Sequence, residues 1–174
     1  LEQLIRDLRF VNELPVEHNW RILEPRMEST RRELAREFGC DPEEMAINRN
    51  ASEGMETMIL GLDLAKGDEV IVTNQDHEAN SGPWRRLADA GIEVREWRID
   101  PVTGHLNPED LEALLDENVR LVCFPHCSNV IGEINPVTEI TAMAHAAGAF
   151  VCVDGVSYVP HGFPDVGELG PDID

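Results

Sequence analysis

The stretch AFVCVD, residues 149–154, decides the fold of this chain. Five apolar residues in a row are typical of a short strand that is covered on both faces, and Asp154 follows them directly. A similar apolar run covers Val119–Pro125. A carboxylate beside a buried strand is costly unless a positive group meets it. The sequence therefore predicts strands of a buried sheet, with a cation in front of Asp154.

Strand-like runs alternate with helix-like segments along the rest of the chain. Three more strands are expected, at Met45–Asn48, Glu69–Thr73 and Ile92–Trp97. Helices are expected at residues 27–38, from the cap residue Asn107, and from Pro136 to Gly148. This alternation predicts an α/β fold with three αβα layers and a mainly parallel sheet. Because ligands of such sheets bind beyond the carboxyl ends of the strands, the residues after each strand are candidate site residues.

The composition limits the classes of function. The chain has 174 residues, 42% of them hydrophobic, and a formal net charge of −20 from 34 acidic and 14 basic residues. Such a surface repels phosphate backbones, so we expect no nucleic-acid partner. No apolar run is long enough to span a bilayer, and the charged first residues lack the apolar region of a signal peptide, so we expect a cytoplasmic protein without a membrane partner. The acid excess with one lysine fits either adaptation to high salt or a genome that favours arginine codons.

The four cysteines are spaced as buried thiols rather than as a metal site. No pair has C-x-x-C spacing, and two of the four lie in apolar strand-like runs; they are Cys40, Cys123, Cys127 and Cys152. We therefore expect reduced thiols and predict no metal centre.

Four residues after strands or at a helix start stand out chemically. Ser52 opens a helix, where free amides and a hydroxyl either bind a phosphate or simply cap the helix. His77 places an imidazole after the second expected strand, and Asn129 lies in a loop after the fourth. Asp154 closes the series. Taken together, a phosphate-binding turn, a stacking ring, an amide and an acid are the layout expected around a phosphorylated heteroaromatic cation.

At this point the chain resembles the class V aminotransferase family, which includes the cysteine desulfurases and uses pyridoxal 5′-phosphate (PLP). The resemblance runs from about Asn48 to Asp174. Its most specific segments are NASEG at residues 50–54, DHEAN at 76–80, SNVIGEINPV at 128–137, and VDGVS at 153–157 followed by Pro160-His161. The resemblance implies the large domain of the PLP-dependent transferase fold.

The resemblance also implies roles for single residues. Ala51 and Ser52 match the turn that binds the phosphate, and His77 matches the imidazole that stacks on the pyridine ring and shuttles protons. Asn129 matches the asparagine near the phenolic oxygen of the ring. Asp154 matches the acid that pairs with the pyridine nitrogen and keeps it protonated. His77 and Asp154 are therefore the expected catalytic residues.

Two departures from the family pattern concern Ser157 and the Schiff-base lysine. Desulfurases carry a glutamine, and some relatives a histidine, where this chain has Ser157, which can still donate to the phenolic oxygen. In relatives the lysine follows a segment like the one that ends here at Asp174, whereas the single lysine of this chain is Lys66. We therefore expect a fragment, with a helical segment at residues 1–44 and a partial PLP-binding large domain at 45–174.

The resemblance favours a PLP enzyme that acts on an amino acid, with a cysteine desulfurase or lyase as the first expectation. An aminotransferase and an isopenicillin-N-epimerase-like racemase are alternatives that use the same cofactor residues. A non-catalytic α/β binding module is the alternative outside enzymes. The resemblance also implies a homodimer for the intact protein.

Overall fold

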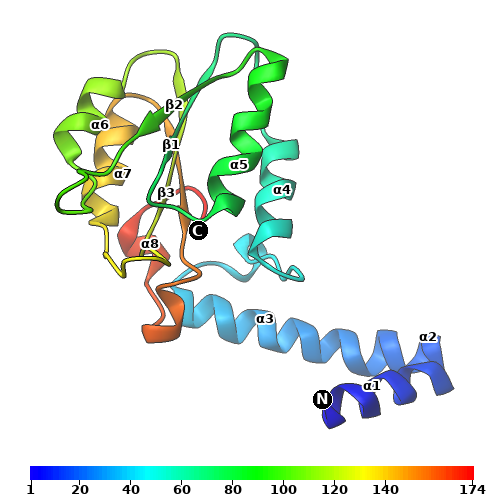
Figure 1. The fold of residues 1–174 in the computed structure, drawn as a ribbon. Coiled ribbons are helices and arrows are strands. Elements are labelled where there is room, and N and C mark those ends of the chain that lie inside the picture. The colour runs from blue at the N-terminus through cyan, green and yellow to red at the C-terminus, as the bar shows by residue number, and fades with distance from the viewer. The chain divides into compact units, whose positions relative to one another are not determined.

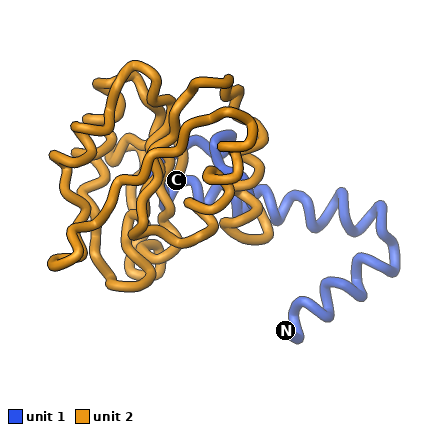
Figure 2. The backbone as a smooth tube through the Cα atoms, turned by 45° about the horizontal axis from the view of Figure 1, so that its top comes forward, with its two compact units in different colours: residues 1–47 blue, residues 48–174 orange.

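A computed structural model describes all 174 residues, which form two compact units, residues 1–47 and 48–174 (Figure 2). The first unit is helical, and its elements are α1 (Glu2–Glu13), α2 (Pro15–His18), a π-helical turn (Asn19–Leu23), α3 (Glu24–Phe38) and a 3₁₀ turn (Pro42–Glu44). Gly39 ends α3 with a φ of 69°, a left-handed conformation that glycine adopts without steric cost. This end is as predicted, while the helix begins three residues earlier than expected.

The strand expected at Met45–Asn48 is wrong. These residues are outside any helix or strand, and Ile47 is half exposed. A strand is stable only where a neighbour completes its backbone hydrogen bonds. No strand pairs with this segment, which lies at the boundary between the two units.

The second unit is built on a sheet of four parallel strands, β1 (Glu69–Thr73), β2 (Glu93–Trp97), β3 (Val119–Pro125) and β4 (Phe150–Asp154). The order across the sheet is β2-β1-β3-β4. The α/β fold and the parallel sheet are therefore confirmed. The order reverses between β1 and β3, because the chain leaves β1 towards β2 on one side and returns to its other side. Ligands of open α/β sheets bind at such a reversal.

Helices cover both faces of this sheet, which gives the three αβα layers (Figure 1). On one face lie α4 (Ala51–Gly61) and α5 (Glu78–Arg86), and on the other lie α6 (Pro108–Leu114) and α7 (Val137–Ala146). A 3₁₀ turn (Leu87–Ala90) follows α5, and a second 3₁₀ turn (Val159–His161) and α8 (Val166–Leu169) follow β4. No helix combines the length and the apolar character that crossing a membrane requires.

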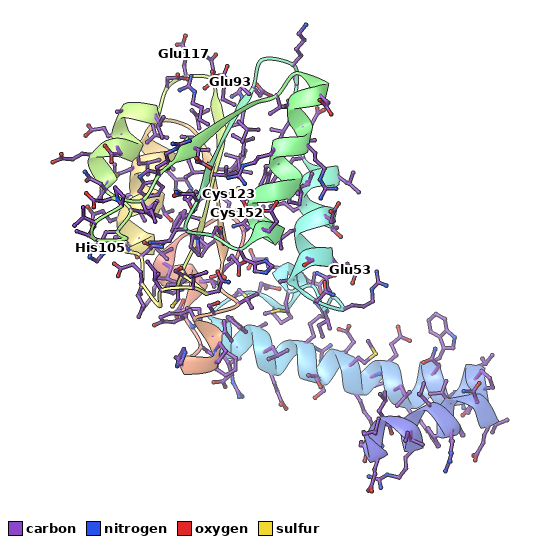
Figure 3. The ribbon with its side chains drawn as sticks, viewed as in Figure 1. Glu53, Glu93, His105, Glu117, Cys123 and Cys152 are labelled. Carbon is purple, nitrogen blue, oxygen red and sulfur yellow. The ribbon has the colours of Figure 1, made fainter.

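The core follows the alternation of side chains along each strand. In β1, Val70 and Val72 pack in the cluster under α4 and α5, while Ile71 packs in the cluster under α6 and α7. Cys123 and Cys152 are direct neighbours on β3 and β4 and lie side by side, fully buried, in the first of these clusters (Figure 3). Both are free thiols, as expected.

Capping residues set where the helices of the second unit begin and end. The side chain of Asn107 accepts a hydrogen bond from Glu109 N at 3.1 Å, as predicted for the start of α6. Pro136 precedes α7, and Gly148 follows its end with a φ of 85°. These residues set the ends of α6 and α7, and the loops that lead into the two helices come from the carboxyl ends of β2 and β3.

Candidate functional site

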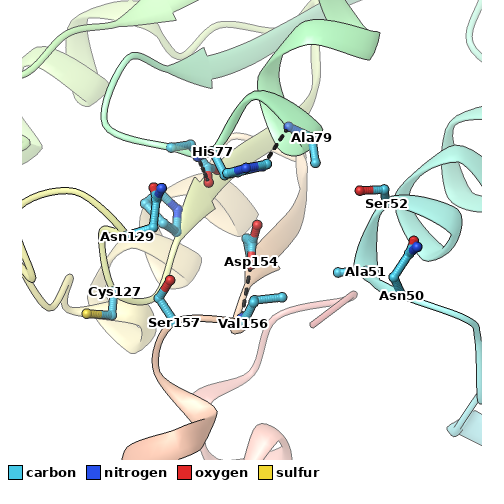
Figure 4. A pocket seen from close by; sticks show the side chains of 12 residues that line it. Asn50, Ala51, Ser52, His77, Ala79, Cys127, Asn129, Asp154, Val156 and Ser157 are labelled. Atoms are coloured by element: carbon cyan, nitrogen blue, oxygen red, sulfur yellow. Dashed lines mark hydrogen bonds between the residues drawn. The ribbon is translucent and has the colours of Figure 1, made fainter.

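A cavity of about 280 Å³ lies at the carboxyl ends of β1, β3 and β4 (Figure 4). It is at the reversal of strand order described above. All six residues selected from the sequence line it: Ala51, Ser52, His77, Asn129, Asp154 and Ser157. The start of α4 brings the first two, the β1–α5 junction brings His77, the β3–α7 loop brings Asn129, and the end of β4 brings the last two.

Asp154 is the last residue of β4, and its backbone extends the sheet. Its carbonyl accepts a hydrogen bond from His126 N at 3.0 Å. Its carboxylate accepts one hydrogen bond, from Val156 N at 3.0 Å. No arginine or lysine lines the cavity, so this carboxylate has no basic partner there. In the structure, Asp154 is thus a partly buried acid that faces the cavity, and no lysine or arginine of the chain meets it there.

The start of α4 forms another wall of the cavity. Asn50 caps this helix, since its side chain accepts a hydrogen bond from Glu53 N at 2.9 Å. The capping role considered for Ser52 thus belongs to Asn50, and the hydroxyl of Ser52, an exposed residue, faces the cavity. The amides of Ala51 and Ser52 belong to the first turn, which has no intrahelical acceptors for them. Together with the helix dipole they favour an anion.

His77 caps α5 and lies on the opposite wall. Its Nδ1 accepts a hydrogen bond from Ala79 N at 3.1 Å (Figure 4). An imidazole nitrogen that accepts a hydrogen bond carries no proton, so the neutral ring holds its proton on Nε2. The fold thereby selects one tautomer for the ring that faces the cavity.

Asn129 is positioned by a network of buried polar side chains around Gln75. The hydroxyl of Ser128 donates to Gln75 O at 3.2 Å, and Asn135 Nδ2 donates to Gln75 Oε1 at 2.7 Å. Gln75 Nε2 in turn donates to Gly104 O at 2.9 Å. One buried amide therefore ties the end of β1 to the loop after β2 and to the β3–α7 loop that carries Asn129.

The structure adds residues that the sequence did not single out. Asp76 and Cys127 line the cavity, and so does Asn50. Asp76 is partly buried, and burial, together with the nearby charge of Asp154, raises the pKa of its carboxyl to about 7. The available signal for Asp76 was its place between β1 and His77, where an acid follows a buried strand as Asp154 does. Asn50 could have been found as the best capping residue before the helix.

The sequence profile of the aminotransferase class-V family matches residues 17–173. The chain belongs to the class V aminotransferase family. It is 45% identical over 111 residues to a cysteine desulfurase from Yersinia pseudotuberculosis, an alignment covering 63% of this chain and 27% of that protein. An aminotransferase-like protein from Gibberella zeae is 39% identical over 134 residues, which are 75% of this chain and 33% of that protein.

A solved structure supports the same fold. A lysine mutant of C-DES, with glycine covalently linked to its PLP cofactor, superposes with a TM-score of 0.82 and 24% identity, covering 99% of this chain and 47% of that one. The chain thus spans about a quarter to a third of the two curated relatives and less than half of C-DES. The fold class and the family expected from the sequence are both confirmed.

Proposed function

We propose that these residues form the cofactor-binding part of a PLP-dependent enzyme that acts at the α-carbon of an amino acid. The observation that carries the proposal is the cavity of about 280 Å³ at the reversal of strand order. It joins an anion-favouring helix start, a ring of fixed tautomer and a carboxylate without a lysine or arginine partner in a member of the class V aminotransferase family. Each of these three features would match one part of PLP: the helix start matches the phosphate, the imidazole matches the face of the ring, and the carboxylate matches the pyridine nitrogen.

The cation end of the cavity fits a protonated pyridine nitrogen. Asp154 accepts one backbone hydrogen bond, which leaves acceptor positions on a carboxylate that no basic side chain of the cavity pairs with. A partly buried carboxylate without a cationic partner has lost some of its hydration, and a cationic ring nitrogen would offset that loss. Asp154 would therefore hold the ring in its protonated form.

The anion end fits a phosphate. Ala51 and Ser52 offer first-turn amides and a hydroxyl at the start of an 11-residue helix, with the positive end of the helix dipole behind them. Glu53, the acid in this turn, is bonded to Arg49 at 2.7 Å and so opposes an anion less than a free carboxylate would. Arg49 does not itself line the cavity.

When bound, PLP supplies an electron sink for a carbanion at the substrate α-carbon. The chain's own residues would orient the cofactor and keep its ring nitrogen protonated. His77 presents the Nε2–H of its neutral ring to the cavity as a hydrogen-bond donor, and the ring presents a flat face for stacking. Asn129 and Ser157 would donate hydrogen bonds to an oxygen on the ring, with Ser157 reaching less far than the glutamine of desulfurases.

The lysine that links PLP covalently would come from outside these 174 residues. Lys66, the single lysine, lies in the turn before β1, at the amino ends of the strands, whereas the cavity is at their carboxyl ends. We propose that the second unit, with the residues from 45 onward, is one part of a larger PLP-binding domain. The homodimer and the cytoplasmic location expected from the resemblance stay predictions.

Cysteine desulfuration is the favoured reaction, because a relative that is 45% identical over 111 residues is a cysteine desulfurase. Transamination is the second candidate, supported by the aminotransferase-like relative that matches 75% of this chain. The two differ in the fate of the substrate, since desulfuration yields alanine and sulfur, and transamination needs a keto acid acceptor.

The test uses the full-length protein with added PLP. We expect a visible absorption band from bound PLP that borohydride abolishes, with the cofactor then covalently attached to the protein. Incubation with cysteine and a thiol reductant, which reduces the released sulfur, should give alanine and sulfide. A keto acid requirement without sulfide would replace desulfuration by transamination. If PLP neither binds nor becomes attached, the cavity is not a PLP site and the proposal fails.

A further inference from the structure

Asp76 lies in the cavity and has no role in the function proposed so far. It follows the end of β1 and precedes the first turn of α5. Its Oδ1 accepts a hydrogen bond from His77 N at 2.7 Å, and its Oδ2 accepts one from Asn80 Nδ2 at 2.6 Å. These two bonds clamp the beginning of α5, so that Asp76 fixes the backbone from which the His77 imidazole projects.

The partner of Asp76 has a free acceptor of its own. Asn80 is fully buried, and its Oδ1 has no hydrogen-bond partner. A 180° turn of this amide would exchange Oδ1 and Nδ2. Ionised Asp76 accepts from Nδ2, as in this structure, and neutral Asp76 would donate its proton to Oδ1 after the turn. The pair can therefore keep its hydrogen bond in either protonation state.

The groups that face Asp76 favour its neutral form. From β4 it faces the charge of Asp154, and from β3 it faces Cys123, whose pKa burial raises so that it stays a thiol. On its own segment it meets the backbone of His77 and the amide of Asn80. Burial, with Asp154 as second cause, raises the pKa of Asp76 to about 7. No lysine or arginine lines the cavity to oppose this.

We propose that Asp76 is a positioning residue that holds the start of α5, and with it His77, and whose ionisation adds to the negative field that binds a cation at Asp154. This inference rests on the proposed PLP site. A second carboxylate near Asp154 strengthens the attraction for a protonated ring nitrogen when it is charged and has no such effect when it is neutral. The affinity for the cofactor would then depend on pH, because Asp76 strengthens it only when its carboxyl is charged.

The first arm of the test needs no cofactor. The folded pKa of about 7 is above the ordinary value of an aspartate, so Asp76 stabilises the fold fully below that ordinary value and loses this contribution as pH rises towards 7. The full-length protein, freed of PLP, is unfolded in urea at pH values from about 4.5 to 8. Wild type should lose stability relative to Asp76→Asn over this range and level off above pH 7.

The variants are chosen to keep the fold. Asp76→Asn is isosteric with the neutral carboxyl and keeps an acceptor for His77 N and a donor for Asn80 Oδ1. Asp76→Ser removes the carboxyl while leaving a hydroxyl, and the same loss of pH dependence is expected. Asp89→Asn is the matched control, because Asp89 is an exposed aspartate in the turn after α5. The control should keep the wild-type slope.

The second arm measures the affinity for PLP by absorption at about pH 8 and about pH 5.5, on either side of this transition. Asp76→Asn should bind PLP roughly five- to tenfold more weakly than wild type at the higher pH, and equally at the lower pH, where wild-type Asp76 is neutral too. An equal ratio at both pH values would overturn the electrostatic role. If the free energy of unfolding of both Asp76 variants depended on pH as it does in wild type, Asp76 would not be the group that titrates. Failure of the wild type to bind PLP would sink the proposed function, while the unfolding slopes would still decide the ionisation of Asp76.

Discussion

Asp154 would control the electronic state of the ring, whereas other residues would hold PLP in place. Replacing Asp154 with alanine in the full-length protein is therefore expected to abolish turnover and leave part of the PLP bound. The α4 start and the His77 ring remain in this variant, so the phosphate and the ring face keep their contacts. Turnover is measured with cysteine and PLP content by absorption. Asp89→Asn serves as control, and near-normal turnover of Asp154→Ala would contradict the assigned role.

A substitution of Ser52 distinguishes phosphate binding from helix capping as the role of this residue. Because Asn50 caps α4, Ser52→Ala should leave the helix intact and weaken PLP binding by about 1–2 kcal/mol, the scale of one hydrogen bond to a charged group. The affinity is measured by titration of the cofactor-free protein. Thr57→Ala is the control, since Thr57 is exposed in the same helix and its hydroxyl bonds to Glu53 O. Equal affinities for Ser52→Ala and wild type would show that Ser52 does not touch the phosphate.

The sequence predicted residues after strands that line the cavity, and it missed those that depend on distant partners. Asp154, Asn129 and His77 could be found because a parallel sheet brings the ends of its strands to one edge. Gln75 could not, because its partner Asn135 is 60 residues away and only the folded chain joins them. Asp76 was part of a quoted motif, but its raised pKa arises from burial and from Asp154, which local sequence does not contain.

At the scale of single elements, α6 is held by one fully buried side chain. Leu111 is 0% exposed and packs in the cluster under α6 and α7, so Leu111→Ala should lower the free energy of unfolding by about 2–5 kcal/mol. Leu60→Ala, in α4, makes the same chemical change at a side chain that is 83% exposed, and it should have an effect within about 0.5 kcal/mol. Urea unfolding measures both. Similar losses for the two variants would mean that α6 does not pack as described.

The elements themselves were predictable where local signals and burial agree. In β3 and β4 a run of apolar residues fits strands covered on both faces, and α6 begins at its predicted cap. Met45–Asn48 has a short apolar pattern too, yet it forms no strand. Its residues contain no information about whether a neighbouring strand exists, and pairing depends on that neighbour.

At the scale of the whole molecule, the dominant feature is charge. A net charge of −20 on 174 residues makes the folded chain repel itself, and unfolding relieves that repulsion by separating the charges. Several exposed ion pairs, such as Arg49–Glu53, offset only a small part, because solvent screens them. Stability should therefore depend on ionic strength more than on any single surface contact.

Added salt should stabilise this chain at neutral pH. Between about 0.1 M and 1 M NaCl the Debye length falls from about 10 Å to about 3 Å, so repulsion among the excess acids is screened. The midpoint of thermal unfolding should rise over this range. The control repeats the series at about pH 5.5, nearer to the isoelectric point of about 4.5, where the net negative charge is smaller and a smaller rise is expected. Equal rises at both pH values would assign the effect to a general strengthening of apolar burial by salt rather than to charge. A larger rise at neutral pH than at about pH 5.5 would mean that the excess of acidic residues makes the stability of the fold depend on salt.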